Sequence, residues 1–107
     1  VKTLCRGLKY PAGIAQLPDG YLLVVESSSH CIHRISLDGR STVIAGTQGV
    51  SGYIDGTGGQ ALFSTPTNLC LDREGNAYIV DYGNRAIRKL IFPAKWSVGK
   101  REHRHQF

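Results

Sequence analysis

Short apolar runs alternate with turn-forming sequences along most of the chain. The runs are too short for typical helices, and no segment places its apolar residues at the helical period. Leu, Val, Ile and Tyr are frequent in these runs, as is typical of strands. The pattern therefore predicts short antiparallel strands at residues 13–17, 21–26, 31–37, 41–45, 68–72, 77–82 and 86–92.

The polar segments between these runs have the composition of tight turns. Asp-Gly and Glu-Gly pairs follow three of the runs, and an acid followed by small or polar residues ends two others. Glycine supplies positive φ in such turns, and Asp or Asn can bond to nearby backbone. We expect structural turn roles for Gly20, Glu26, Gly39, Gly75, Asp81 and Gly83.

The chain contains an internal repeat. Residues 10–35 align with residues 65–90 at an offset of 55 without a gap, with identities at Pro11/Pro66, Gly20/Gly75, Val25/Val80 and Ile32/Ile87. A shorter match at an offset of 39, "TLCRG" with "TVIAG", indicates a basic unit of about 39 residues. One connection, 47–65, is therefore enlarged and rich in glycine.

The repeated strands predict an all-β fold of β-propeller blades. The runs Leu22–Val25 and Tyr78–Val80 are nearly continuous in apolar residues, so their sheets should be covered on both faces. Repeated four-stranded antiparallel sheets that cover one another are the blades of a propeller. The basic unit of about 39 residues has room for the four strands of such a blade.

The motifs resemble those of the NHL-repeat family. The resemblance rests on "P-x-G-I-A…PDG…L-V-V-E…H-C-I-H-R-I…DG…VIAG" and on "P-T-N-L-x-L-D-R-E-G-N-A-Y-I-V-D-Y-G-N-R-A-I-R-K-L". The departures are Ser28-Ser29, where the family favours Gly-Asn, and Asn68, where Gly is usual. The resemblance implies a six-bladed propeller that serves mainly as a binding scaffold, with enzymes as a minority.

The repeat divides the chain into five parts. They are the last strand of a preceding blade (1–9), a first repeat (10–46), the Gly-rich inter-blade loop (47–65), a partial second repeat (66–92) and a basic tail (93–107) that is poorly ordered or forms an irregular outer strand. Six blades need about 240 residues, and this chain has 107 and no Met. We expect either a fragment or a two-bladed unit that self-associates to cover its open blade faces.

Composition narrows the function classes. The net charge is +5, but residues 1–94 contribute only +2 of it, so the basic character lies mainly in the tail. No apolar segment is long enough to span a membrane, so membrane insertion is not expected, and the compartment stays unknown. The three widely spaced cysteines are expected to be small buried residues, not a disulfide framework or a zinc site.

Strand direction sorts the connections onto two ends of the blades. The turns after the second strand of each unit share one end with the loop 47–65, and loops on a rigid scaffold commonly carry binding residues. Candidate partner contacts at this end are His30, Tyr53, Asp55, Asn84 and Arg85. We expect Asp81 to cap its own turn, with positive φ at Gly83 and Asn84, and Ile87 and Leu90 to point into the inter-blade core.

Apparent catalytic and metal motifs have simpler interpretations. On a strand, His30 and His33 of "HCIH" point to opposite faces, and Arg85 and Arg88 replace them in the second unit, so surface cations are expected. The glycines of "IDGTGGQ" lack the remainder of a phosphate-binding motif. We therefore expect no catalytic residue, metal or cofactor.

Three functions remain open. The first is a non-enzymatic scaffold that binds a protein partner on the loop-bearing end. The second is a metal-dependent lyase or lactonase-like enzyme, for which the inner strands offer only Gln16, Asn68 and Asp72. The third is an RNA-binding NHL propeller, weakly supported by Arg85, Arg88 and Lys89.

Overall fold

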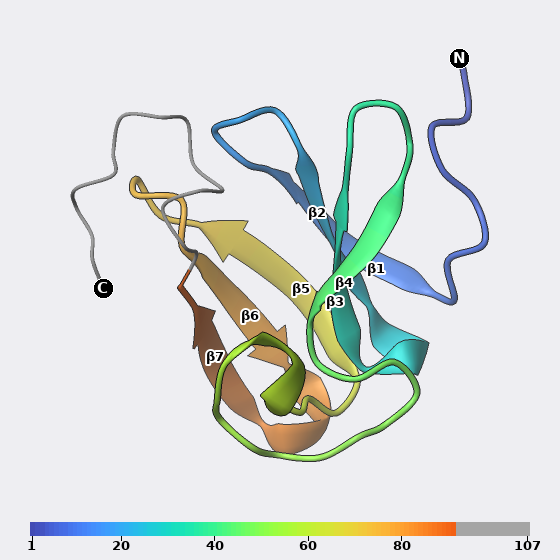
Figure 1. Ribbon diagram of the computed structural model, residues 1–107. Helices are drawn as coiled ribbons and strands as arrows, with labels where there is room; N and C mark the ends of the chain where they lie inside the picture. Colours follow the sequence, from blue (N-terminus) through green and yellow to red (C-terminus); the bar gives the residue numbers. More distant parts are fainter. Residues whose placement is uncertain (92–107) are drawn as a thin grey trace.

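The computed structural model describes residues 1–91 and contains two antiparallel sheets (Figure 1). The first has the order β1-β2-β3-β4 and the second the order β5-β6-β7. Their bounds are β1 (Pro11–Gln16), β2 (Leu22–Glu26), β3 (Cys31–Ile35), β4 (Ser41–Ala45), β5 (Pro66–Leu71), β6 (Ala77–Asp81) and β7 (Ala86–Leu90). The prediction of an all-β chain with these antiparallel strands is confirmed.

The only helices among the described residues are three single 3-10 turns, at Ser27–Ser29, Gly58–Gln60 and Tyr82–Asn84. Across residues 1–91 there is no helix with the length and apolar character needed to cross a membrane. Residues 1–9 form no strand, and their role as the end of a preceding blade stays a prediction. The predicted tail, 93–107, lies outside the described residues.

The sequence repeat is also a repeat of backbone geometry. Pro11 pairs with Glu26 and Pro66 with Asp81, and both ladders have an irregularity just after this first pair. The hairpins behave alike, since Gly20 N–H donates to Leu17 O and Gly75 N–H donates to Asp72 O. The positive φ of Gly20, Gly39 and Gly75 is the geometry that favours glycine in these turns.

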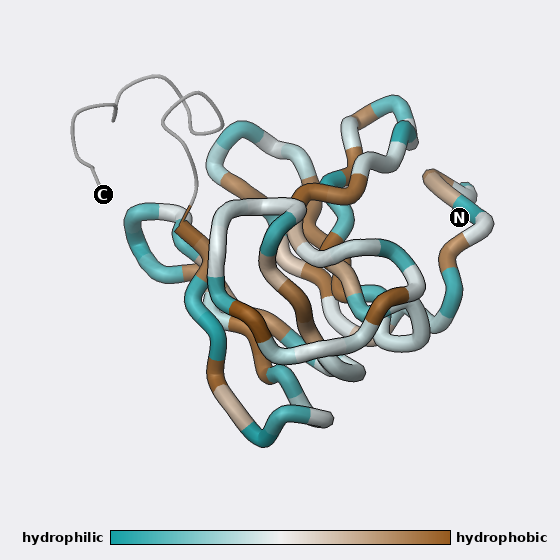
Figure 2. Tube along the Cα trace, turned by 60° about the horizontal axis from the view of Figure 1, so that its bottom comes forward, coloured by the Kyte–Doolittle hydropathy of each residue, from teal (hydrophilic) through white to brown (hydrophobic). Residues whose placement is uncertain are grey.

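The main core lies between the two sheets. Leu23, Val25 and Ile32 of the first sheet are fully buried there, and Ala77 and Ile79 of the second sheet are equally inaccessible. Phe63, from the connection between the sheets, is 3% exposed and closes the core from the side. Figure 2 shows the apolar strands at the centre and polar residues concentrated in the turns.

One predicted core residue is instead exposed. Ile87 occupies the position of Ile32 one repeat later, yet Ile32 is fully buried and Ile87 is 67% exposed. The second sheet covers Ile32, whereas no described residues cover the matching face of the second sheet. The expectation that Ile87 points into the core is therefore wrong here. Leu90, in contrast, does pack against the core.

Candidate functional site

The loop 47–65 lies at the same end of the molecule as the turns that follow β2 and β6. Figure 1 shows the green loop beside these two turns, with the hairpins after β1, β3 and β5 at the opposite end. We call the end that carries the loop the loop face. The antiparallel strand order produces this separation, as the sequence pattern predicted.

Arg88 fastens the loop to the second sheet. Its guanidinium is almost buried and donates hydrogen bonds to Leu62 O at 2.9 Å and to Ile54 O at 2.8 Å. It also pairs with Asp81 at 2.7 Å and with Asp55 at 3.0 Å. The planar fork of arginine suits this arrangement, because several donors act at once in fixed directions.

Asp81 supplies the buried charge that balances Arg88. Its side chain is inaccessible to solvent, and it accepts hydrogen bonds from Asn84 Nδ2 at 2.7 Å and from Ser64 N–H at 2.8 Å. The backbone donor therefore comes from the loop, and the turn itself has no side-chain cap bond. The expectation that Asp81 caps its own turn is wrong, because a longer-range donor occupies the carboxylate.

Positive φ in the two corner turns falls on other residues than expected. His30 has φ 58° and Arg85 has φ 53°, each directly after its 3-10 turn, whereas Gly83 is not in the left-handed region. Gly83 is required for space: an added Cβ would lie 2.4 Å from Ser64 Oγ and 2.6 Å from Ser64 O. The glycine therefore permits the loop to approach the turn.

The structure brings four of the five candidate contact residues to one corner. Asp55 and Tyr53 both contact Arg88, with the Tyr53 ring centroid 5.0 Å from the guanidinium carbon, and Asn84 donates to Gly52 O at 2.8 Å. Arg85 ends the same turn and is exposed. His30 lies in the other corner turn, where its Nδ1 accepts the Thr65 N–H at 2.9 Å.

Exposed tyrosines gather on the loop face and were not predicted as a group. Tyr10 is 69% exposed, Tyr53 62% and Tyr82 68%, and the loop adds exposed Val50 and Ile54. Tyr10 and Thr65 occupy equivalent positions before the first strand of each unit, and both have positive φ. The signal available in the sequence was that Tyr10, Tyr53 and Tyr82 all fall in segments assigned to this end.

A hollow of about 340 Å³ lies between the loop and β7. Tyr53, Asp55 and Phe63 line one side, and Ile87 to Leu90 of β7 line another. In the first sheet the corresponding strand, β3, pairs with β4 along this edge. The hollow therefore lies where a fourth strand of the second sheet would run.

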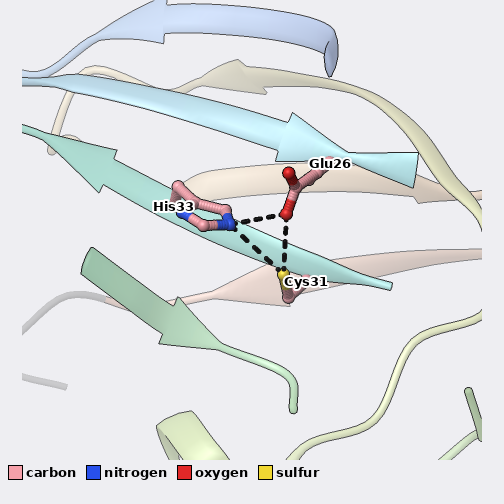
Figure 3. Close-up of side chains that lie close together, drawn as sticks. All are labelled: Glu26, Cys31 and His33. Carbon is pink, nitrogen blue, oxygen red and sulfur yellow. Dashed lines mark hydrogen bonds and ion pairs between the residues drawn. The ribbon is translucent and has the colours of Figure 1, made fainter. Parts of the chain in front are cut away.

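A second group of titratable side chains is buried beneath the turn that follows β2. Glu26, Cys31 and His33 direct their reactive atoms toward one another, as Figure 3 shows. Burial raises the pKa of the Cys31 thiol to about 12, with a further contribution from the Glu26 charge. Burial also raises the pKa of Glu26, but hydrogen bonds from Lys9 N–H and His33 outweigh it, and the net pKa is below the ordinary value of 4.5.

The surface interpretation of the "HCIH" cations is wrong for one residue of each pair. His33 is 6% exposed and Arg88 is 7% exposed, and each pairs with the acid that ends the preceding strand. The predicted alternation along a strand does not apply to His30, which precedes β3 with a φ of 58°. Of the cysteines, Cys31 is buried as expected, but Cys70 is exposed.

Comparisons with known proteins give relatives of this fold. No protein-family model matches the chain. The chain is 30% identical over 84 residues to the protein SUPPRESSOR OF QUENCHING 1, chloroplastic, of Arabidopsis thaliana, a match that covers 78% of this chain and 8% of that protein. The chain thus corresponds to a small part of that relative.

Solved structures from Bacteroides are similar to this chain in shape. A protein of unknown function from Bacteroides thetaiotaomicron has 34% identity and a TM-score of 0.69, over 74% of this chain and 20% of that one. An auxiliary nutrient binding protein from Bacteroides ovatus has 27% identity and a TM-score of 0.68, over 78% and 23%. A second auxiliary nutrient binding protein, from Bacteroides thetaiotaomicron, has 29% identity and a TM-score of 0.66, over 76% and 22%.

These matches and the repeated sheets show a propeller-type fold. The chain is all-β, and its two antiparallel sheets are successive blades, of which the first has four strands and the second three among the described residues. The chain spans less than a quarter of each of the three solved relatives.

Proposed function

We propose that this chain is part of an NHL-repeat propeller that acts as a non-enzymatic scaffold and binds a protein partner on the loop face. The observation that carries the proposal is the set of three exposed tyrosines on the loop face: Tyr53 on the anchored loop, Tyr10 just before β1, and Tyr82 in the turn after β6. The repeats would be 10–46 and 66–92, with 47–65 as the inter-blade loop.

The anchoring of the loop favours a role in binding a partner over a role as a simple linker between the two blades. Arg88 and Asn84 together hold the carbonyls of Gly52, Ile54 and Leu62, so the backbone on both sides of Tyr53 is fixed. A preorganised surface loses less conformational entropy when a partner binds. Tyrosine is enriched at protein interfaces because it offers a large rigid contact area and a polar hydroxyl.

Charged groups at this surface would supply specificity. Asp55 is 92% exposed although one of its oxygens pairs with Arg88, and Arg85 is exposed at the adjacent turn. Two charges of opposite sign beside an aromatic group suit a protein surface better than a uniformly anionic RNA backbone. Two of the solved relatives are auxiliary nutrient binding proteins, which supports a binding role in general.

Further blades would cover the open faces of the two sheets. Ile14 on β1 is 62% exposed, whereas its equivalent in the second sheet, Leu69, is 7% exposed because it faces the first sheet. Val80 and Ile87 are likewise exposed where Val25 and Ile32 are buried. Additional blades of the same protein, or a second copy, would bury these residues as the two present sheets bury one another.

Site-specific photocrosslinking tests the partner surface. A photoreactive phenylalanine analogue is placed at Tyr53 or Tyr82, with Leu37 as the matched control, because Leu37 is 63% exposed and lies at the opposite end of the blades. We expect discrete protein crosslinks from the two loop-face positions and none from position 37. Equal crosslinking from all three positions, or crosslinks to RNA alone, would contradict the proposal.

A further inference from the structure

The buried side chains of Glu26, Cys31 and His33 form a three-sided cluster at the junction of β2 and β3 (Figure 3). His33 Nε2 lies 2.7 Å from Glu26 Oε1, and Cys31 Sγ lies 3.5 Å from each of these atoms. All three residues are almost inaccessible to solvent. One sulfur, one nitrogen and one oxygen therefore face a common centre in the protein interior.

The spacing of these atoms is close to that around a tetrahedral zinc ion. Bonds of about 2.3 Å to sulfur and about 2.0–2.1 Å to nitrogen and oxygen place sulfur about 3.6 Å from the other ligands, and nitrogen about 3.3 Å from oxygen. The two sulfur separations of 3.5 Å already fit. Only the hydrogen-bonded pair, His33 and Glu26, must open, by about 0.6 Å.

Neighbouring groups hold the side chains of His33 and Glu26 in orientations suited to binding a metal ion. Ser41 Oγ lies 2.7 Å from His33 Nδ1, which orients the imidazole with Nε2 toward the centre. Such a partner on the far ring nitrogen is typical of metal-binding histidines. Lys9 N–H holds the second oxygen of Glu26, so Oε1 alone is directed toward the sulfur and the nitrogen.

The second blade shows what this position requires. There the equivalent acid, Asp81, is neutralised by the permanent cation of Arg88, and Ala86 replaces the cysteine. In the first blade, His33 replaces the arginine, and an imidazole can be neutral whereas a guanidinium cannot. The first blade also has the thiol of Cys31, which the second blade lacks at this position. A buried carboxylate needs a positive partner, and a bound divalent cation would be one.

We propose that Glu26, Cys31 and His33 form a buried site for a thiophilic divalent cation, with Zn²⁺ as the preferred ion. One carboxylate, one thiolate and one neutral imidazole carry two negative charges, which balance the ion. Binding displaces the proton of the Cys31 thiol into solvent and replaces the hydrogen bond between His33 and Glu26. Three protein ligands leave a fourth position for water.

Cobalt substitution provides a direct test. The protein is prepared with Cys5→Ser and Cys70→Ser, so that Cys31 is the only thiol of the chain. Titration with Co²⁺ should give a thiolate-to-cobalt charge-transfer band and intense tetrahedral visible bands that saturate at one equivalent. Zn²⁺ should abolish these bands. Because the band requires a thiolate, adventitious binding to other histidines would not produce it.

Two variants separate metal binding from folding. Cys31→Ala/His33→Arg recreates the arrangement of the second blade, in which an arginine pairs with the buried acid and no cysteine is present at this position. This variant should therefore fold but show no cobalt bands. Ser41→Ala keeps every ligand and should weaken Zn²⁺ binding by about 10-fold to 100-fold. A folded protein without a thiolate band in excess Co²⁺ would overturn the proposal, as would bands that persist at full strength in His33→Ala.

Discussion

Glu26 and Asp81 end the second strand of their blades, and each accepts a hydrogen bond from the backbone segment that enters its blade. The donor is Lys9 N–H for Glu26 and Ser64 N–H, at 2.8 Å, for Asp81. The two donors are separated by the same offset of 55 residues as the two acids. Each carboxylate also pairs with a residue on the third strand, His33 or Arg88, so one buried acid fixes both the entry and the middle of a blade.

The first prediction concerns the charge of Asp81. Asp81→Asn leaves the buried Arg88 without its best partner, since Asp55 is 92% exposed and its pairing is screened by water. We expect the free energy of unfolding to fall by about 3–5 kcal/mol, the usual cost of breaking a buried pair. Urea denaturation measures this change.

Asp38→Asn is the matched control, because Asp38 lies in an exposed turn, where its bond to Arg40 is open to solvent. It should leave the free energy of unfolding almost unchanged. Similar losses from both substitutions would show that burial of the Asp81–Arg88 pair is not what stabilises this corner.

The second prediction concerns the loop. Arg88→Lys keeps the positive charge but cannot reproduce four hydrogen bonds, so the carbonyls of Ile54 and Leu62 lose their donor. We expect faster hydrogen exchange at the Gly52 and Leu62 amides, which bond within the loop, and no change in β1 and β2. Exposed Arg85→Lys should leave loop exchange as it is; equal acceleration by both variants would contradict the anchoring role.

The third prediction concerns pH. The pKa of Glu26 is lowered in the folded protein, so this carboxylate stabilises the fold above its ordinary pKa of 4.5, and that contribution is lost as pH falls through the lower folded value. Unfolding free energies of the native protein and Glu26→Gln should therefore differ most near neutral pH. The difference should shrink once the pH is below 4.5. A constant difference down to acid pH would contradict the assigned direction.

The fourth prediction concerns thiol reactivity. Because the pKa of Cys31 is raised to about 12, only about one molecule in ten thousand carries its thiolate at a pH of about 8. Alkylation of the metal-free native protein should label exposed Cys70 and spare Cys31, while all three cysteines should react after unfolding. Mass spectrometry of the peptides measures both results. Rapid native labelling of Cys31 would show that the site is open.

The fifth prediction concerns the contact between the inner strands. A Cβ added at Gly13 would lie 2.8 Å from Asn68 Oδ1 and 2.9 Å from Asn68 Cα, so the blades would have to separate. We expect Gly13→Ala to lower the free energy of unfolding by about 1–3 kcal/mol. Gly59→Ala is the control, since nothing lies within 4 Å of its added Cβ. Equal thermal stability of the two variants would contradict close packing at Gly13.

The sequence by itself determined the strands, their order and the two ends of the blades. Turn pairs such as Asp19-Gly20 and short apolar runs act locally, so their meaning does not depend on distant residues. The repeat then added long-range information, because equivalent residues adopt equivalent backbone, as Tyr10 and Thr65 do with their positive φ. Tyr53 and Asp55 meet Asn84 and Arg85 at one corner because the antiparallel strand order places the loop and the turn after β6 at the same end.

Only the tertiary structure decided which polar residues are buried and what they contact. His33 and Arg88 were expected to be surface cations because both units place a cation at this position. Their burial depends on the loop that covers Arg88 and on β4 beside His33. Ile87 read as a core residue because Ile32 is one, yet burial of this position requires a neighbouring blade. Strand identity is set by local physics, whereas the environment of a side chain is set by what packs against it.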